Sequence, residues 1–208
     1  HSFPTRRSSD LEEIVAASLV RLMRESPDQT TLPLLCRLLR QDASPLVRAA
    51  AASALHGCPE PAAAKALAAA AGDTVRLVRV RVAAALAPYP ESWIPQEAGD
   101  AVRAATDEFA TAMNARPDDH ASHYNRGNWQ MDRGDFAAAA DAFAMASRLA
   151  PDVLPPLVNA SLALNALGRN TEAEEALRRA LEIAPRDAAV HFNLGLLLGE
   201  LGRADEAK

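Results

Sequence analysis

Aromatic residues, glycine and cysteine are all scarce in this sequence of 208 residues. Aromatics make up 4% of the chain, and there are nine glycines and two cysteines. Two cysteines are too few for a disulfide framework or for a zinc site of their own. No apolar run approaches the roughly 20 residues that a membrane-spanning helix needs. The formal charge of −5 argues against the overall basic surface on which non-specific nucleic-acid binding depends.

Alanine, in contrast, is abundant, with 47 copies in the chain. It has the highest helix propensity of all residues, and its small side chain lets neighbouring helices pack closely. The runs of Val, Ile and Thr that are typical of strands are few. The composition therefore predicts an all-helical protein and excludes an all-β or Rossmann-type fold.

The first 11 residues, HSFPTRRSSDL, differ from the alanine-rich chain that follows. They equal the in-frame translation of a widely used short-read sequencing adapter, and chance does not explain a match of this length. We therefore predict that residues 1–11 are an artefact, and we leave them out of the fold as one leaves out an expression tag. The natural N-terminus is then missing from this sequence, so the localisation cannot be predicted from a leader.

A repeat of 31 residues runs through the following segment. Seven pairs of identical residues share this offset between residues 42 and 86, among them Asp42 with Asp73 and Arg48 with Arg79. Each copy predicts a first helix, at 30–41 and 61–71, and a second helix, at 44–56 and 75–87. Gly57 and Gly72 follow predicted helices, where C-caps are expected. A helix over 12–25 completes the set as the second helix of an earlier unit.

The pattern of an Asp shortly before a Val-Arg pair, and then an alanine-rich helix, resembles short HEAT-like repeats over residues 12–87. Its recurrent arginines have two interpretations: a basic ridge for an acidic partner, or ion pairs with acids such as Asp42 and Asp73 in neighbouring units. We favour the ion pairs, because they would order the stack. The arginines are Arg48, Arg76, Arg79 and Arg81.

A proline-rich stretch over residues 88–96 follows the HEAT-like segment. It contains PYPESWIP, with three prolines in eight residues, and such a density breaks helices. We predict a junction here. Trp93 lies in it, and we expect this side chain to pack between the two arrays rather than to form a ligand platform.

A second repeat, of 34 residues, begins after the junction. The recurring positions are Gly134, Gly168 and Gly202; Asn125, Asn159 and Asn193; Ala139, Ala173 and Ala207; and the small residues Gly127, Ser161 and Gly195. This frame resembles the tetratricopeptide repeat: a small residue in the first helix, Gly at the turn, Ala and a large apolar residue in the second helix, and Pro after it. The resemblance covers residues 120–208. It predicts an array over 118–208, with repeats at 120–153, 154–187 and 188–208.

The same frame extends back by half a unit, to residues 97–117. We predict one second-type helix there that docks on the first full repeat and joins the two arrays. The fold class is therefore predicted to be an all-α, right-handed α-solenoid, with short HEAT-like helical pairs followed by a tetratricopeptide superhelix. The last repeat stops within its second helix at Lys208, and we expect the chain to be a fragment of a longer protein.

Candidate chemistry is limited to isolated side chains. His120 and His123 have metal-ligand spacing, but His123 falls at the packing position of Leu157 in the next repeat, and a third ligand is missing. Cys36 lies on an apolar helix face, and Cys58 has no basic neighbour that would lower its pKa. The sequence contains no haem, phosphate-loop or nucleophile motif. We predict a protein that is not an enzyme and holds no cofactor or metal.

The resemblance to tetratricopeptide repeats implies a binding groove lined by the first helix of each unit. In the family, the recurrent Asn bonds the backbone of an extended peptide; here the alternative is that each Asn bonds locally within the array. Tyr124, Ala189 and Asn193 occupy positions where some members carry a basic carboxylate clamp, so an apolar or polar peptide is expected. The predicted groove residues are Asn125, Asn159, Asn193, Tyr124, Asn128, Met131, Val158, Leu162 and Phe192.

The leading functional prediction is a non-enzymatic scaffold that binds a protein or peptide segment in this groove. An alternative follows from the order of HEAT-like units, junction and tetratricopeptide repeats, which resembles the C-terminal half of bacterial multihaem c-type cytochromes. This fragment would then be the docking arm of a periplasmic electron-transfer protein; otherwise we expect a cytoplasmic location. A third interpretation, a lyase acting on bilin chromophores, depends on the 31-residue repeat alone.

Overall fold

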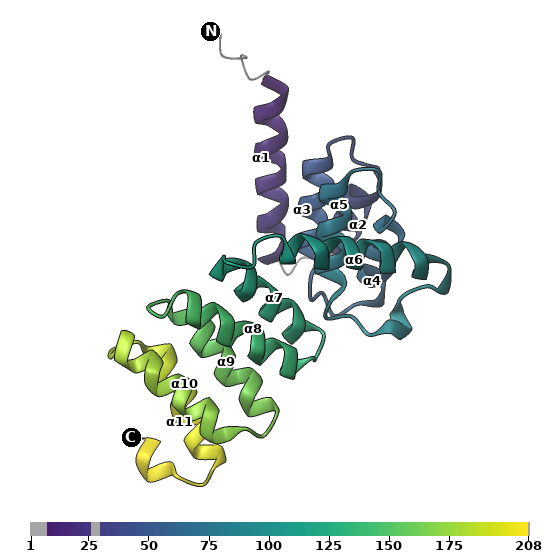
Figure 1. Cartoon of the computed structure of the whole chain (residues 1–208). Coiled ribbons are helices and arrows are strands. Elements are labelled where there is room, and N and C mark those ends of the chain that lie inside the picture. The colour runs from purple at the N-terminus through teal and green to yellow at the C-terminus, as the bar shows by residue number, and fades with distance from the viewer. Residues whose placement is uncertain (1–7, 26–29, 208) are drawn as a thin grey trace. The chain divides into compact units, whose positions relative to one another are not determined.

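The computed structural model describes residues 8–25 and 30–207, and every regular element in these two ranges is a helix (Figure 1). The prediction of an all-helical fold is confirmed. The chain divides into two compact units, His1–Ala112 and Met113–Lys208, and each is described by itself. Most of the predicted artefact, residues 1–7, lies outside the described residues, while residues 8–11 form the start of the first helix.

The first unit consists of short helices that follow the 31-residue repeat. Their bounds are α1 (Ser8–Leu22), η1 (Met23–Glu25), α2 (Thr31–Gln41), α3 (Pro45–Leu55), α4 (Pro61–Ala70), α5 (Arg76–Leu86), η2 (Glu91–Trp93), η3 (Gln96–Ala98) and α6 (Gly99–Asn114), the last of which crosses the division between the units. Helix α3 packs against both α1 and α5, and α2 and α4 pack against the same layer. Pairs of helices therefore stack in the manner of a solenoid.

Small side chains fill the centre of this first unit. Ala51, Ala52, Ala63 and Ala64 are fully buried, and Leu55 and Leu67 lie in the same core. Because alanine has no side chain beyond Cβ, the helices that carry it approach closely, and the core gains its apolar burial from many small contacts. The abundance of alanine in the sequence is thus a packing property of this unit.

The Asp and Arg of the 31-residue repeat have the same local role in both copies. The Asp42 carboxylate accepts from the Ser44 amide at 2.8 Å, and the Asp73 carboxylate accepts from the Val75 amide at 2.8 Å. One turn into each following helix, Arg48 and Arg79 donate back to the carbonyl oxygens of Asp42 and Asp73, both at 2.8 Å. The repeat signature is therefore a device that closes the turn before each second helix.

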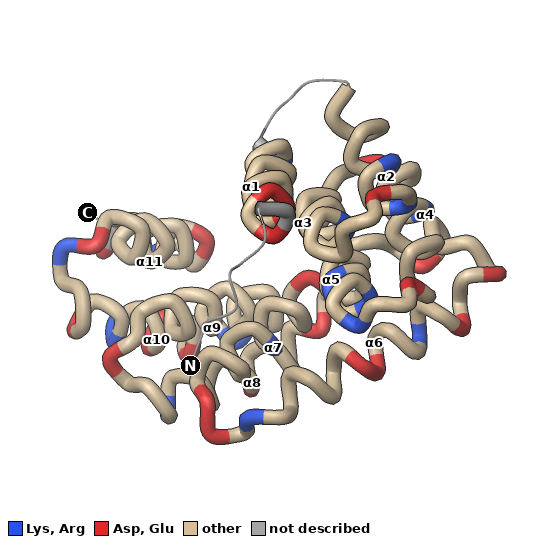
Figure 2. Tube along the Cα trace, turned by 90° about the horizontal axis from the view of Figure 1, so that it is seen from above, with Lys and Arg blue, Asp and Glu red and all other residues tan. Residues whose placement is uncertain are grey.

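The same arginines also connect successive units. Arg48 donates from Nε and Nη2 to the two carboxylate oxygens of Asp73, at 2.8 and 3.1 Å, and both side chains are largely buried. Arg76 and Arg79 on α5, where Figure 2 shows a concentration of basic positions, pair with Glu108 on α6. The prediction that the recurrent arginines form ion pairs between units is confirmed for Arg48 and Asp73.

The proline-rich junction and α6 pack onto the core of the first unit. Trp93 contacts this core, and its ring lies 6.1 Å from that of Tyr89. The Tyr89 hydroxyl donates to the Leu55 carbonyl oxygen, which ties the junction to the end of α3. Ala101, Val102, Ala105 and Phe109 place one face of α6 against the same core. The docking of this helix on the first tetratricopeptide repeat stays a prediction.

The second unit repeats one helical hairpin. Its elements are α7 (His120–Asp132), α8 (Phe136–Leu149), α9 (Leu154–Ala166), α10 (Asn170–Ile183), α11 (Ala188–Glu200) and η4 (Ala204–Ala207). Consecutive helices pack on one another, and α9 also contacts α7 and α11 (Figure 1). Gly134, Gly168 and Gly202 all adopt φ near +73°, a conformation that residues with a Cβ rarely take, so the three turns have one geometry.

Gly57 has the same left-handed conformation at the end of α3, as predicted for a C-cap. Gly72 also lies where the sequence predicted, directly after Ala71, the C-cap of α4. It does not share the left-handed conformation of Gly57, and a Cβ added to it would lie 3.9 Å from the Ala101 Cβ, which is ordinary contact. Within the described residues, no helix is long and apolar enough to cross a membrane.

A large side chain interlocks with a small one at the centre of the second unit. Phe143 on α8 is fully buried, and a Cβ built on Gly127 of α7 would lie 2.4 Å from a carbon of its ring. Ser161, at the equivalent position of α9, is also buried. The expectation that only a small residue fits at this position is confirmed for Gly127. The Tyr124 ring, on the same helix as Gly127, also packs against Phe143, with the two ring centroids 5.9 Å apart.

Candidate functional site

The candidate site is the surface formed by the first helices of the second unit, α7, α9 and α11. The nine residues predicted to line the groove all lie on these helices, and we call them the first-helix face: Tyr124, Asn125, Asn128, Met131, Val158, Asn159, Leu162, Phe192 and Asn193. Because α9 contacts both α7 and α11, equivalent positions on neighbouring helices lie side by side.

Three of these side chains are joined by hydrogen bonds. The Asn159 amide nitrogen donates to the Asn128 side-chain oxygen at 2.8 Å and to the Tyr124 hydroxyl at 3.3 Å. Asn159 thus links α9 to α7, which agrees with the second of the two predictions for the recurrent Asn, that it bonds locally within the array. Its side-chain oxygen accepts no hydrogen bond from the residues that the structure describes, so one half of this amide is still available to a ligand.

The other two recurrent asparagines differ from Asn159. Between residues 30 and 207, no side-chain hydrogen bond is formed by Asn125, which is exposed, or by Asn193, which is half-buried. For Asn193, the repeat gives the reason. Asn159 bonds Tyr124 and Asn128 of the preceding repeat. One repeat later, the equivalent positions are Val158 and Leu162, and neither side chain has an acceptor for Asn193.

Large apolar side chains are exposed along this face. The exposed fractions are 44% for Leu162 on α9 and 65% for Phe192 on α11. Leu196, which stands one repeat after Leu162, is 51% exposed and was missed among the predicted site residues. The 34-residue register was the signal that would have found it. Val158 and Met131 are partly buried and pack against the core beneath.

The histidines near this face have structural partners. His123 is buried; its Nε2 lies 2.8 Å from the Pro117 carbonyl oxygen, and its Nδ1 lies 3.0 Å from an Arg126 guanidinium nitrogen. Since Arg126 can only donate, Nδ1 accepts and Nε2 carries the proton. His191 repeats the first bond, to the Pro185 carbonyl oxygen at 2.9 Å. Nε2 of His123 therefore connects α7 to the preceding turn, and Nδ1 is engaged by a side chain of α7 itself.

The described part of the chain offers no group of three or more side chains placed to hold a metal. The two cysteines pack at the edge of the first unit's core, and burial raises the pKa of both Cys36 and Cys58. A thiol with a raised pKa is a weak nucleophile at neutral pH, because little of it is ionised. The arrangement of the first-helix face is suited to binding by apolar contact and amide hydrogen bonds.

Comparisons with known proteins agree with the two repeat periods. A family model described as HEAT repeats matches residues 6–87, and one described as TPR repeat matches residues 162–202. No curated protein matches significantly.

Among solved structures, a crystal structure of MamA is similar with 19% identity and a TM-score of 0.45, over 62% of this chain and 71% of that one. A second MamA crystal structure has 20% identity and a TM-score of 0.45, over 67% and 74%. A MamA mutant has 15% identity and a TM-score of 0.46, over 96% and 94%. On the two family models and the helical pairs, the chain is a repeat protein that combines HEAT repeats with tetratricopeptide (TPR) repeats.

Proposed function

We propose that this protein is a non-enzymatic interaction scaffold whose first-helix face binds an extended, largely apolar protein segment. TPR repeats support a role in protein interaction in general. The observation that carries the finer proposal is the row of exposed Leu162, Phe192 and Leu196 on adjacent first helices. Exposed apolar side chains that gather on one face mark interaction sites, and aromatic residues among them often dominate the binding energy.

The asparagines supply the polar part of the proposed contact. Asn125 and Asn193 each present a donor and an acceptor, and Asn159 keeps its oxygen. An extended peptide exposes alternating N–H and C=O groups, so such amides can bond its main chain whatever its side chains are. The nine residues of the first-helix face include no Lys or Arg, and we therefore expect the bound segment to be held without a carboxylate clamp.

The test is a selection of 12-residue peptides from a displayed library on the intact chain, followed by affinity measurements on variants. Phe192→Ala removes the most exposed aromatic anchor, and we expect it to weaken binding about tenfold or more. Asn193→Ala removes an amide with no partner in the described structure, and we expect about a fivefold loss with unchanged thermal stability. Leu149→Ala, an exposed apolar residue on the second helix α8, is the matched control.

Selected peptides that bind Phe192→Ala and Leu149→Ala as well as the unaltered protein would place the binding surface elsewhere. Equal losses in both variants would indicate non-specific apolar adsorption, and would also contradict the proposal. A loss confined to Phe192→Ala and Asn193→Ala supports it.

The cytochrome interpretation stays a prediction, because none of these comparisons tests it. It concerns sequence that would precede residue 12 in the parent gene. Several Cys-x-x-Cys-His motifs in that region would support it, and a different kind of domain there would contradict it.

A further inference from the structure

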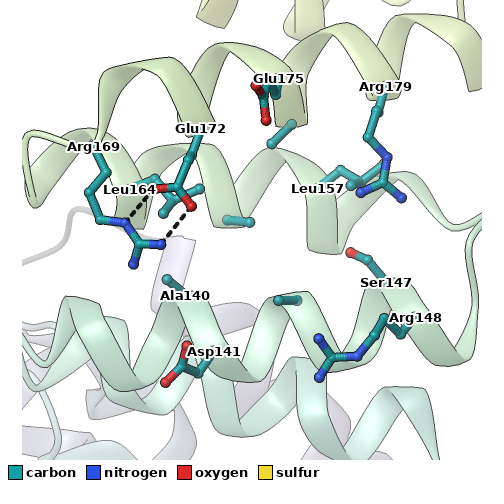
Figure 3. A pocket seen from close by; sticks show the side chains of 13 residues that line it. Ala140, Asp141, Ser147, Arg148, Leu157, Leu164, Arg169, Glu172, Glu175 and Arg179 are labelled. Carbon is teal, nitrogen blue, oxygen red and sulfur yellow. Dashed lines mark hydrogen bonds and ion pairs between the residues drawn. The ribbon is translucent and has the colours of Figure 1, made fainter.

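A cleft of about 270 Å³ lies between the second helices α8 and α10, with α9 as its floor (Figure 3). It contains none of the residues of the first-helix face. Its floor is apolar and is formed by the buried residues Leu157, Ala160 and Leu164 of α9. The walls carry small residues at this level, Ala140 on α8 and Ala176 on α10, which leaves space between the two helices. The volume lies just below the range that is typical of ligand sites, so the cleft suits a small group.

One end of the cleft is basic. Arg148 from α8 and Arg179 from α10 both line it; in Figure 3, Arg179 points from α10 toward Leu157, and Arg148 lies along α8. Arg148 makes one weak contact, at 3.5 Å to the Met145 sulfur, and Arg179 forms no hydrogen bond or ion pair with the residues described. Two guanidinium groups from different helices thus line one cleft, and neither has an ion-pair partner among the described residues. Arginine is the side chain best suited to bind a carboxylate through paired hydrogen bonds.

A buried hydroxyl group lies at the same end. Ser147 is 5% exposed, and its Oγ has no hydrogen-bond partner within the described structure. Figure 3 shows this side chain between Arg148 and the floor of the cleft. Leaving a buried hydroxyl unsatisfied costs free energy, and an unpaired group of this kind calls for a specific explanation. An anion held by the two arginines would accept the missing hydrogen bond.

The rest of the lining carries the acidic groups. Glu172 is neutralised by Arg169 through two hydrogen bonds of 2.7 and 2.6 Å, while Asp141 on α8 and Glu175 on α10 line the cleft and form no ion pair with the described residues (Figure 3). The Asp141 and Glu175 carboxylates would repel a second negative group. The lining therefore selects a ligand with a single negative charge at one end and an uncharged, apolar stem on the floor.

We propose that this cleft binds a carboxylate at the end of a short aliphatic stem. The carboxylate lies between Arg148 and Arg179 and accepts from the Ser147 hydroxyl, and the stem lies on Leu157 and Ala160. Two sources have this chemistry: a free short-chain carboxylic acid, and a glutamate side chain of a partner protein. The site is separate from the first-helix face, so either proposal can fail without the other.

The experiment follows the amide NMR signals of the intact chain during titration with four probes. Hexanoate carries the proposed chemistry, hexanol lacks the charge, hexyl phosphate carries a larger charge, and N-acetylglutamate N-methylamide represents a protein side chain. We expect hexanoate or the capped glutamate to shift signals of α8 and α10, and hexanol and hexyl phosphate to bind at least about tenfold more weakly. Whichever carboxylate binds more tightly identifies the source.

Variants of the cleft give the matched controls. Arg148→Gln and Arg179→Gln are expected to weaken the carboxylate about tenfold each, because each removes a charge-assisted hydrogen bond. Ala144→Leu keeps both arginines but fills the cleft, and it is expected to abolish binding. Arg186→Gln removes an exposed arginine of the same unit outside the cleft and leaves binding unchanged.

Three results would overturn the proposal. They are no signal shift with either carboxylate at tens of millimolar, equal binding by the unaltered chain and both cleft arginine variants, and tighter binding of hexyl phosphate than of hexanoate. Thermal unfolding of each variant shows that it is folded. Both arginines are exposed side chains, so their replacement leaves the helices intact.

Discussion

The two units of this molecule stack helical pairs by different physical means. In the first unit, the helices are joined across repeats by arginine and carboxylate groups, with Arg48 and Asp73 as the most buried pair. In the second unit, the adjacent helices α7 and α8 are interlocked by shape, as Phe143 occupies the space that a side chain on Gly127 would need. Ion pairs can join helices whose facing side chains are all small, as in an alanine-rich core. An interlocked core instead requires one large and one small residue at matched positions.

Ion pairs are not confined to the first unit. Glu174 on α10 is 6% exposed and pairs with Arg203 at 2.6 Å and with Arg178 at 2.5 Å, so the second unit also holds one buried carboxylate. The pair with Arg203 connects α10 to the turn after α11. The comparison therefore concerns which interaction dominates in each unit, and four changes test it.

Phe143→Ala is expected to have the largest effect. It removes a fully buried ring and leaves a cavity between α7 and α8, which costs about 4 kcal/mol of unfolding free energy in the second unit. Hydrogen exchange resolved by residue measures the loss, because the two units need not unfold together. Phe192→Ala, at an exposed ring of the same unit, should change stability by less than about 0.5 kcal/mol.

Gly127→Ala should cost somewhat less, about 2–3 kcal/mol, because the added methyl group meets the buried Phe143 ring at 2.4 Å. Gly199→Ala is the matched change on α11. A Cβ added there would meet no neighbouring atom within 4 Å in the described part of the chain, and alanine is expected to be neutral or to stabilise the helix slightly. Combining Gly127→Ala with Phe143→Leu should recover part of the loss. Equal effects of the two glycine substitutions would refute interlocking by shape.

Arg48→Gln is expected to destabilise the first unit by about 2 kcal/mol. It leaves the largely buried Asp73 carboxylate without its ion-pair partner, and the Asp42 carbonyl oxygen loses a donor. Arg81→Gln, on the exposed side of α5, should be close to neutral. Urea unfolding followed by hydrogen exchange in α3 distinguishes them. If both substitutions lower the free energy of unfolding by the same amount, the first unit does not depend on ion pairs between repeats.

The smallest expected effect is on the response to acid. Burial alone would raise the pKa of Asp73, but hydrogen bonds from Arg48 and the Val75 amide, with the charges of Arg48 and Arg79, lower it below its ordinary value. This stabilisation is present above about pH 4 and is lost as the pH falls through the lowered pKa. When the pH is lowered from about 4 through the pKa of Asp73, the free energy of unfolding should therefore fall less in the Arg48→Gln variant than in the unaltered protein. An identical loss would contradict this assignment.

The repeat periods allowed much of this structure to be predicted. Residues that recur at 31 or 34 positions predicted the turns at Gly134 and Gly168, the small residue at Gly127 and the pairing of Arg48 with Asp73. Each of these depends on the backbone of one repeat or on two adjacent repeats, and periodic positions have periodic environments. Gly72 follows the end of α4 as predicted, but the sequence could not show that it lacks the left-handed conformation of Gly57, because glycine also occurs at ordinary dihedral angles near a helix end.

Features that break the period could not be predicted. Asn159 is bonded within the array and Asn193 is not, because Tyr124 and Asn128 are replaced by Val158 and Leu162 one repeat later. The cleft between α8 and α10 combines Arg148 and Arg179, which are not equivalent positions of the repeat. Such sites arise from the differences between repeats, and only the arrangement in space brings them together.

The central claim is that the first-helix face of the TPR unit binds a protein segment. A photo-crosslinking amino acid in place of Phe192, compared with one in place of Leu149 on the second helix α8, tests it most directly. With a peptide selected on the unaltered protein, we predict crosslinks from position 192 and none above background from position 149. Crosslinks from position 149 alone, or equally from both, would contradict the claim.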